Sequence, residues 1–164
     1  MESRVLIQQF GADDFELYYQ LVSDEQVMAM ITGKAMSRNE ALEAFEATLV
    51  MNKKDPILGK YKVFDALSRE YIGSAKLELD VQQHKQAELG YMLLPSCWGK
   101  GYGGALAQAL VEIARRHGGL KSLYAMTDPN NVASGKILTA RGFTLDRLGE
   151  YKGMPSKFFS MRLD

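Results

Sequence analysis

The chain has 164 residues, 46% of them hydrophobic and 24% charged, a composition that fits one globular domain with a sizeable core. Its 20 basic and 20 acidic residues cancel, and without a basic surplus we expect no nucleic acid partner. No apolar run approaches the ~18 residues needed to span a bilayer, and the early acid Glu2 argues against a secretory signal, so we expect no membrane partner.

Cysteine and histidine usage narrows the chemistry. The single cysteine, Cys97, has no internal disulfide partner, which fits a reducing compartment and a cytoplasmic location. No histidine lies near Cys97 in the sequence, so a nucleophilic role for its thiol is disfavoured. His84 and His117 are far apart and lack cysteine or carboxylate pairs at ligand spacing, and we therefore expect no metal site.

The predicted elements begin with a strand over residues 4–9. The apolar stripe after Gly11 predicts a helix, because its large side chains recur at helical spacing. Ser37 and Glu40 form the capping box S-x-x-E, which predicts the start of a further helix.

The middle of the chain changes to a period of two, which is typical of half-buried strands. We predict an antiparallel meander of three strands, over residues 61–67, 71–80 and 87–94. A strongly amphipathic helix then ends near Gly118. The remaining predicted elements are a strand over 123–127, a helix over 131–141 closed by Gly142, and strands over 143–148 and 156–163.

These elements predict an α+β fold over a single domain, residues 1–164. Its central sheet is mixed, mostly antiparallel and made of six to seven strands, with helices on both faces. One βαβ crossover, residues 87–127, lies in the middle of the sheet.

A glycine-rich turn, residues 95–104, precedes the amphipathic helix. Backbone N–H groups in such a turn can point to a common centre, because glycine has no Cβ in the way. The helix N-terminus adds its dipole, and Lys100 adds a mobile positive charge, which together indicate a phosphate or pyrophosphate site. The alternative, a tight turn without a ligand, is disfavoured because so many glycines destabilise a fold. The four glycines fall within six positions: Gly99, Gly101, Gly103 and Gly104.

Two familiar phosphate motifs do not fit this turn. Its glycines match G-x-G-x-x-G, but four residues separate the strand from Gly99 and only one βαβ unit is predicted, unlike a dinucleotide-binding fold. A flavin- or nicotinamide-binding protein is therefore the weaker interpretation. Lys100 is not followed by Ser or Thr, which excludes a mononucleotide P-loop.

The turn instead resembles motif A of the GNAT acetyltransferases, Q/R-x-x-G-x-G/A. Gly101 and Gly103 occupy the glycine positions, and Trp98 stands where many members carry Gln or Arg. The segment 130–143, NNVASGKILTARGF, resembles the second motif, N-x-x-(A/S)…G-F. The segments ELGY (residues 88–91) and WGKGYG (residues 98–103) are similar to sequences in the branch of ribosomal-protein N-terminal acetyltransferases and spermidine acetyltransferases.

The resemblance implies an acyl-CoA N-acyltransferase fold that binds acetyl-CoA as cosubstrate. In this family the pantetheine arm lies between two parting strands and would pair with the backbone of Met92, Leu93 and Leu94. A backbone N–H near Met92 or Leu93 would polarise the thioester carbonyl. Asn131 and Ser134 would reach the pantetheine, and Trp98 would pack over the turn. The pyrophosphate would be held by the N–H groups of Gly99, Lys100, Gly101, Tyr102, Gly103 and Gly104.

The implied reaction is direct transfer of an acetyl group to a primary amine in a ternary complex. We take Glu88 as the candidate general base, and a solvent-facing strand acid is its equally weighted alternative. The tyrosine acid that many members carry is replaced by Leu138. Ser134 or a water would then protonate the thiolate, unless Ser134 only starts its helix.

The acceptor stays open between a peptide or protein N-terminus, a polyamine and a small-molecule amine. Met28, Met30 and Met36 indicate either an adaptable apolar wall for that acceptor or plain core. A catalytically weak CoA-binding sensor or scaffold is the alternative function, and the chain is expected to be a monomer or a homodimer.

Overall fold

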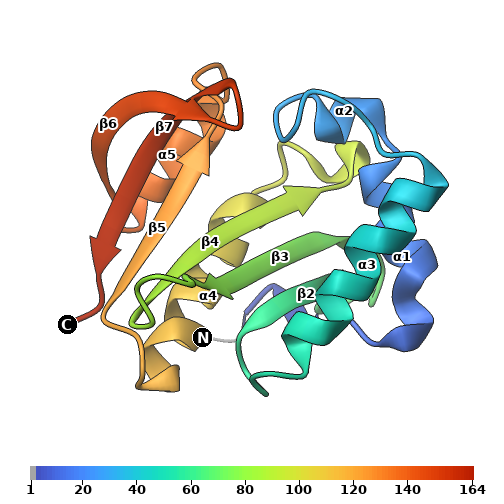
Figure 1. Cartoon of the computed structure of the whole chain (residues 1–164), viewed down its shortest axis with the longest axis horizontal. Coiled ribbons are helices and arrows are strands. Elements are labelled where there is room, and N and C mark those ends of the chain that lie inside the picture. The colour runs from blue at the N-terminus through green and yellow to red at the C-terminus, as the bar shows by residue number, and fades with distance from the viewer. Residues whose placement is uncertain (1–2) are drawn as a thin grey trace.

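The computed structural model describes residues 3–164, which form one seven-stranded sheet flanked by helices (Figure 1). The strands are β1 (Val5–Gln9), β2 (Gly59–Asp65), β3 (Tyr71–Leu79), β4 (Gln86–Leu93), β5 (Ser122–Thr127), β6 (Thr144–Tyr151) and β7 (Met154–Arg162). The α-helices are α1 (Phe15–Val22), α2 (Glu25–Met28), α3 (Arg38–Asn52), α4 (Tyr102–His117) and α5 (Val132–Ala140), with short 3-10 turns at Ala12–Asp14 and Pro95–Cys97.

The sheet order is β1-β2-β3-β4-β5-β7-β6. Every neighbouring pair is antiparallel except β4 and β5, which are parallel and joined through α4. The predicted fold class is thus confirmed: a mixed, mostly antiparallel sheet with one βαβ crossover.

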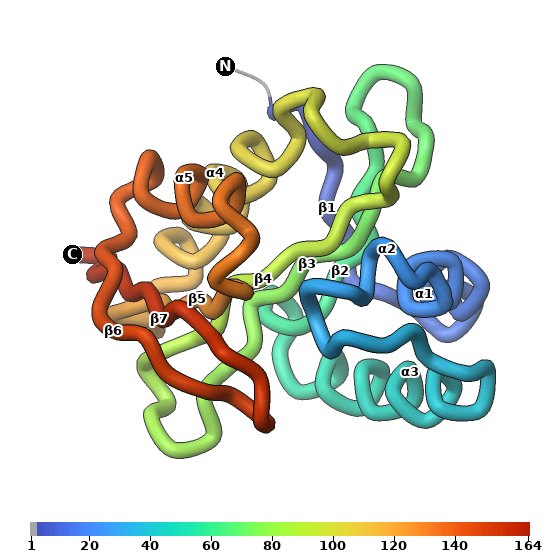
Figure 2. Tube along the Cα trace, turned by 90° about the horizontal axis from the view of Figure 1, so that it is seen from above, coloured from blue at the N-terminus to red at the C-terminus, as the bar shows by residue number. Residues whose placement is uncertain are grey.

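Two apolar clusters cover the two faces of the sheet. Helices α1 to α3 lie on one side of β2 to β4, and α4 and α5 lie on the other (Figure 2). The α4 side holds the larger cluster, with Leu77 and Leu110 fully buried, while Leu21 and Phe45 anchor the smaller one. The sheet therefore has the two-sided helical cover that the sequence predicts.

Helix ends follow the local signals in the sequence. Ser37 and Glu40 form the predicted capping box, with Glu40 N donating to Ser37 Oγ at 3.2 Å and Ser37 N to Glu40 Oε1 at 2.9 Å. Helix α4 ends at Gly118, whose φ of 79° lies in the left-handed region that glycine favours.

Some boundaries differ from the prediction for identifiable reasons. Strand β2 ends at Asp65, because the carboxylate of Asp65 accepts hydrogen bonds from the N–H groups of Leu67 and Ser68 and turns the chain. Strands β6 and β7 extend further toward each other than predicted. They meet in a tight turn at Lys152 and Gly153, both at positive φ.

Candidate active site

Strands β4 and β5 separate in the middle of the sheet. They are paired only where residues 86–88 lie beside residues 122–124, yet β4 continues to Leu93 and β5 to Thr127. A cavity of about 50 Å³ lies where they part. It is lined by Met30, Ile31, Leu89, Gly90, Tyr91, Ala125, Met126, Thr127, Asp128, Asn131, Ser134 and Leu138. The separation leaves one edge of β4 without a strand partner.

Register decides which backbone groups of β4 face this gap. The N–H of Leu94 donates to Ile72 O on the β3 side at 2.9 Å. Paired groups alternate along an antiparallel ladder, so Met92 also faces β3 while Tyr91 and Leu93 face the gap. The backbone groups of Met92 and Leu94, which were expected to pair with pantetheine, therefore face β3, and those of Tyr91 and Leu93 face the gap.

Trp98 closes the far end of this edge. Its indole Nε1 donates to Leu93 O at 2.9 Å, and the side chain is 49% exposed. Trp98 thus packs back over the end of β4, whereas it was expected to pack over the glycine turn, and it occupies one of the two backbone groups of Leu93. The N–H of Leu93 remains directed to the gap.

The glycine turn leads straight into α4. Gly99 and Gly101 have φ of 74° and 84°, a left-handed conformation that a Cβ would strain. Within residues 3–164, no backbone or side-chain acceptor receives a hydrogen bond from the N–H groups of residues 99–104. Several unpaired donors therefore converge at the positive end of a 16-residue helix, the arrangement that binds phosphate.

The other two glycines of the turn allow close packing. A Cβ on Gly103 would lie 2.8 Å from Ile137 Cδ1, and one on Gly104 would lie 3.4 Å from Arg141 Nη2. Both positions bring the first turn of α4 against α5. The turn and α5 are thereby held together on one side of the gap.

A cluster of three side chains holds the outer side of the turn. Arg4 Nη1 donates to Lys100 O at 2.9 Å, and the Arg4 guanidinium lies 4.6 Å above the Tyr102 ring. The Tyr102 hydroxyl donates to the carboxylate of Asp65. This hydrogen bond, with those from the backbone of Ser68 and Leu67, lowers the pKa of Asp65 to about 2. Strands β1 and β2 thus position the glycine turn.

Helix α5 begins at Asn131, on the opposite side of the gap from β4. The Asn131 side-chain oxygen accepts the N–H of Ser134 at 3.2 Å and caps the helix. The Asn131 amide N–H₂ remains available to a ligand. The Ser134 Oγ accepts a hydrogen bond from the Tyr91 hydroxyl at 3.5 Å. Leu138, one turn later, is 2% exposed and has no proton to offer.

Glu88 lies at the last paired position of β4, opposite Tyr124, and not in the separated part of the strand. Its Oε2 is 3.0 Å from Lys76 Nζ, and its side chain is only 14% exposed. The interpretation of Glu88 as a solvent-facing strand acid is therefore wrong. It is a largely buried, ion-paired carboxylate next to the point where the strands part.

Three residues at or beside the gap were not predicted from the sequence. The Tyr91 side chain, whose hydroxyl reaches Ser134, was not among the predicted site groups. Thr127 carries a buried Oγ1 that has no hydrogen-bond partner within residues 3–164. Lys76 pairs with Glu88, and strand alternation alone indicates only that Lys76 faces away from the core. The register of β3 against β4 was the missing information.

The methionines divide between core and cavity. Met28 is 1% exposed and belongs to the cluster around α1 and α3, so it is core. Met36 packs against the same cluster. Met30 lines the cavity between β4 and β5 and is 43% exposed, so of the three methionines it is the one outside the core.

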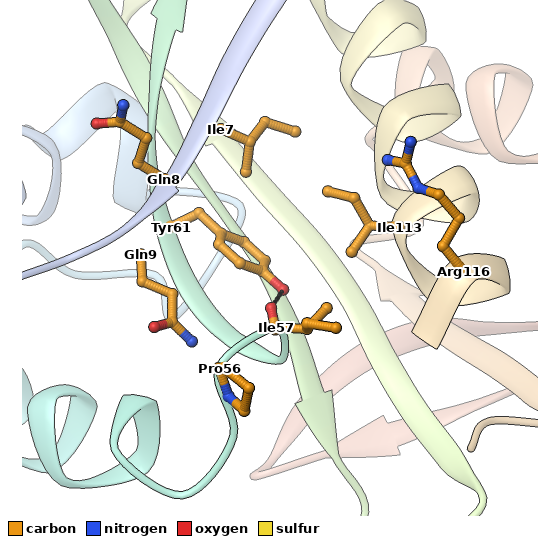
Figure 3. Close-up of a pocket in the computed structure, with 8 residues that line it drawn as sticks. All are labelled: Ile7, Gln8, Gln9, Pro56, Ile57, Tyr61, Ile113 and Arg116. Atoms are coloured by element: carbon orange, nitrogen blue, oxygen red, sulfur yellow. Dashed lines mark hydrogen bonds between the residues drawn. The ribbon is translucent and has the colours of Figure 1, made fainter. Parts of the chain in front are cut away.

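A larger cavity, about 440 Å³, lies elsewhere (Figure 3). It is lined by Ile7, Gln8, Gln9, Pro56, Ile57, Tyr61, Ile113 and Arg116, and Figure 3 shows the Tyr61 hydroxyl bonded to Ile57 O. Ile113 and Arg116 lie in the last turns of α4, whereas the glycine turn precedes its first, about 20 Å away along the helix. This cavity is therefore separate from the gap.

In the part of the chain that the structure describes, no three His, Cys, Asp or Glu side chains are grouped so as to hold a metal ion. None of the described helices is both long and apolar enough to cross a membrane.

Comparison with known proteins matches this geometry to a family. The model of the acetyltransferase (GNAT) domain matches residues 4–144. The uncharacterized N-acetyltransferase YoaA of Bacillus subtilis is 22% identical over 140 residues, which cover 85% of this chain and 79% of that protein.

Two solved structures share the fold. Spermidine N-acetyltransferase from Vibrio cholerae, in complex with CoA and spermine, superposes with a TM-score of 0.81 at 17% identity, over 98% of this chain and 96% of that one. RimL, the ribosomal L7/L12 alpha-N-protein acetyltransferase in complex with CoA, gives 0.81 at 18% identity, over 98% and 95%. The chain belongs to the GNAT family, with neighbours in the expected branch, and is an acetyl-CoA-dependent N-acetyltransferase.

Proposed function

We propose that the protein transfers the acetyl group directly to the primary amine of a peptide or protein N-terminus, a polyamine or a small molecule. The observation that carries the proposal is the parting of β4 from β5 directly beside a glycine turn with free N–H groups. One cleft thus offers an anion site and an open strand edge, which suit the two ends of acetyl-CoA.

Acetyl-CoA would bind along the cleft that runs from the glycine turn to the gap between β4 and β5. The N–H groups of residues 99–104 would hold the pyrophosphate, with Lys100 adding charge. The free edge of Tyr91 and Leu93 would pair with the pantetheine amides, and the Asn131 amide would reach the arm from α5. The thioester would then lie at the cavity between the strands. The N–H of Tyr91, which also faces the gap and belongs to a residue that lines this cavity, would polarise the thioester carbonyl.

The acceptor amine would approach from the face that carries Glu88. Its nitrogen attacks the thioester carbon, a C–N bond forms, and the C–S bond breaks with its electron pair on sulfur. Glu88, directly or through a water, takes the proton that the nitrogen loses. Lys76 Nζ, at 3.0 Å from Glu88 Oε2, holds this carboxylate in place.

The charges around Glu88 bear on the class of acceptor. Lys60 and Lys76 are paired in register on β2 and β3, and Glu78 lies opposite Glu88. Burial lowers the pKa of Lys60, as does the charge of Lys76. The surface around Glu88 therefore carries both positive and negative side chains. It has no surplus of acidic residues, which the binding of a long polycation would need. A singly charged amine, such as a peptide N-terminus or a small molecule, suits it better than a polyamine.

An acceptor screen tests the proposal. Release of free CoA thiol from acetyl-CoA is followed with peptide α-amines, polyamines, aminoglycosides and amino acids, and product masses confirm a gain of one acetyl group. We expect turnover with one class well above the amine-free background. Tight CoA binding without turnover on any amine would support instead the CoA-binding sensor or scaffold, for which the absence of an acid at Leu138 is the favouring observation.

A further inference from the structure

The cavity of about 440 Å³ beside β1 has no part in the reaction proposed above. It lies between β1, the loop before β2 and the last turns of α4, and its volume is in the range of ligand-binding pockets. Figure 3 shows four large side chains around a common space: Ile7, Ile57, Tyr61 and Ile113. The cavity therefore offers a mainly apolar surface.

Hydrogen bonds hold the walls of this cavity in place. His117 Nε2, at the end of α4, lies 3.0 Å from Asp55 Oδ2 in the loop before β2. The Gln9 side-chain amide donates to the backbone oxygens of Asp55 at 2.9 Å and Leu58 at 2.8 Å. The loop is thus tied both to α4 and to β1. A ligand would find the cavity already formed, which lowers the entropic cost of binding.

Strand β1 is at the edge of the sheet, and its outer backbone groups are unpaired. The N–H of Phe10 donates to Lys60 O at 3.1 Å, on the β2 side. Because paired groups alternate along an antiparallel ladder, the N–H and C=O groups of Ile7 and Gln9 point away from β2. No strand of the described chain lies on that side. The open edge thus runs directly beside the cavity.

The two edges of the sheet differ in their protection against strand addition. Strand β6, at the far edge, carries the charged side chains of Asp146, Arg147 and Glu150, and its register shifts at a bulge next to Leu145. Strand β1, VLIQQ, has no charged residue and no proline, and it pairs with β2 without a shift. Charges and bulges keep other chains from pairing with an edge. Strand β1 is therefore the edge that can accept a further strand.

Arg116 gives this site its charge. It lines the cavity, and no carboxylate within residues 3–164 forms an ion pair with it. None of the 8 lining residues is acidic. A second copy of the chain, pairing β1 with β1 about a two-fold axis, would bring the same lining residues and no counter-ion for Arg116. A partner segment that carries a carboxylate would supply one.

We infer that β1 accepts an extended, acidic peptide segment of a partner protein as an eighth strand. The segment pairs its backbone with the open groups of Ile7 and Gln9. One apolar side chain of the segment enters the cavity. A carboxylate two residues away lies on the same face of the strand and pairs with Arg116. The site uses no group of the proposed reaction, so the inference is independent of the proposed function.

The probe is the heptapeptide acetyl-Thr-Glu-Thr-Val-Thr-Glu-Thr-amide. Its valine and both glutamates share one face, so it fits β1 in either strand direction. In a first control peptide both glutamates are glutamine. In two others the alternate backbone nitrogens are methylated, those of valine and glutamate in one and those of threonine in the other. Calorimetry with the full chain measures the affinity of each.

We expect saturable binding of the probe with a Kd below about 1 mM. The glutamine peptide should bind at least tenfold more weakly, because it lacks the charge that pairs with Arg116. Only one of the two methylated peptides should lose binding, because only every second N–H of an added strand faces its neighbour. Non-specific attraction would not distinguish the two.

Variants of the chain test the same contacts from the other side. Arg116→Gln should weaken probe binding about tenfold, whereas Arg115→Gln, the neighbour that does not line the cavity, should change it less than about twofold. Gln9→Pro removes the outward N–H, and proline is tolerated at such an edge position. Gln9→Ala is its match, since both variants lose the side-chain hydrogen bonds. The proline variant should bind at least tenfold more weakly than the alanine variant.

Several outcomes overturn the inference. Absence of saturable binding, equal affinity for the two methylated peptides, or parental affinity in Arg116→Gln would each do so, and these results stand even where melting curves show that Gln9→Pro does not fold. Equal binding of N-acetylglutamate alone would indicate a site for small carboxylates without strand pairing. Self-association of the parent in sedimentation, lost in a folded Gln9→Pro but kept in Gln9→Ala, would show that a second copy occupies the edge instead.

Discussion

The ammonium of Lys76 lies between two carboxylates, at 3.0 Å from Glu88 and 3.6 Å from Glu78. Its aliphatic stem lies over Gly90, where a Cβ would come within 2.9 Å of Lys76 Cε. Glycine at position 90 therefore lets a lysine from β3 cross to the carboxylate on β4. Because the strands part immediately after Glu88, this ion pair borders the place proposed for the thioester.

Glu88→Gln should lower kcat by roughly a hundredfold near neutral pH, because the amide is isosteric but accepts no proton. CoA affinity should change little, since Glu88 lies on the far side of the parting from the glycine turn. Activity should partly return at high pH, where solvent deprotonates the amine unaided. The pH–rate profiles of variant and parent check this expectation. Loss of less than about threefold at every pH would remove Glu88 from the mechanism.

Gly101→Ala should weaken CoA binding at least tenfold, because the new Cβ both strains a φ of 84° and crowds the proposed phosphate cradle. Gly118→Ala is the control for backbone strain, whereas a Cβ at Gly101 would also lie 3.0 Å from Arg4 Nη1. Gly118 has a φ of 79° at the other end of the same helix, and a Cβ there would meet no atom within 4 Å. Both variants should lose about 1 kcal/mol of stability. Calorimetry should find the CoA affinity changed in Gly101→Ala alone, and equal affinities would refute the cradle.

Much of this structure was predictable because its signals are local. The alternation in residues 71–80, the capping box at Ser37 and the glycines of the turn each determine the conformation of their own segment, and the strand, the helix start and the turn lie where they were predicted. Neighbouring residues along the chain decide such features, so one sequence contains enough information for them.

The features that escaped prediction depend on register between distant segments. Strand alternation places Lys76 on the outer face, but only the alignment of β3 with β4 shows that it meets Glu88. Likewise Tyr91 resembles a core residue until α5 brings Ser134 against its hydroxyl. The backbone direction of Met92 and Leu94 was misjudged for the same reason, since it depends on which neighbour takes the first hydrogen bond.

Asp65 links stability to acid pH. Its pKa is lowered to about 2, chiefly by the Tyr102 hydroxyl, so its contribution to stability is complete above its unfolded pKa near 4 and is lost as the pH falls toward 2. Asp65→Asn removes this dependence. Urea unfolding at pH 6, 5, 4 and 3 should show a stability difference between parent and variant that is constant from pH 6 to about 5 and shrinks below 4. A difference independent of pH would contradict the Tyr102–Asp65 hydrogen bond.

Asn131 has two separable roles, because its side chain presents an oxygen to the helix and an amide N–H₂ to the gap. The oxygen caps α5 by accepting the N–H of Ser134 at 3.2 Å. The N–H₂ group is the one proposed to donate to the pantetheine arm. Asn131→Asp keeps a capping oxygen, and its negative charge suits a helix N-terminus, but it loses the donor. Asn131→Ala loses both.

The two variants should therefore separate stability from binding. Asn131→Ala should lower the free energy of unfolding by about 1 kcal/mol, whereas Asn131→Asp should match or exceed the parent. Both should weaken CoA binding, by about 1 kcal/mol or a factor of five or more, since each lacks the N–H₂ donor. Urea unfolding without ligand gives the first quantity and calorimetric titration with CoA the second. Asn131→Asp binding CoA as tightly as the parent would show that Asn131 only caps the helix, and the contact from α5 to the pantetheine would then have to come from another residue of that helix.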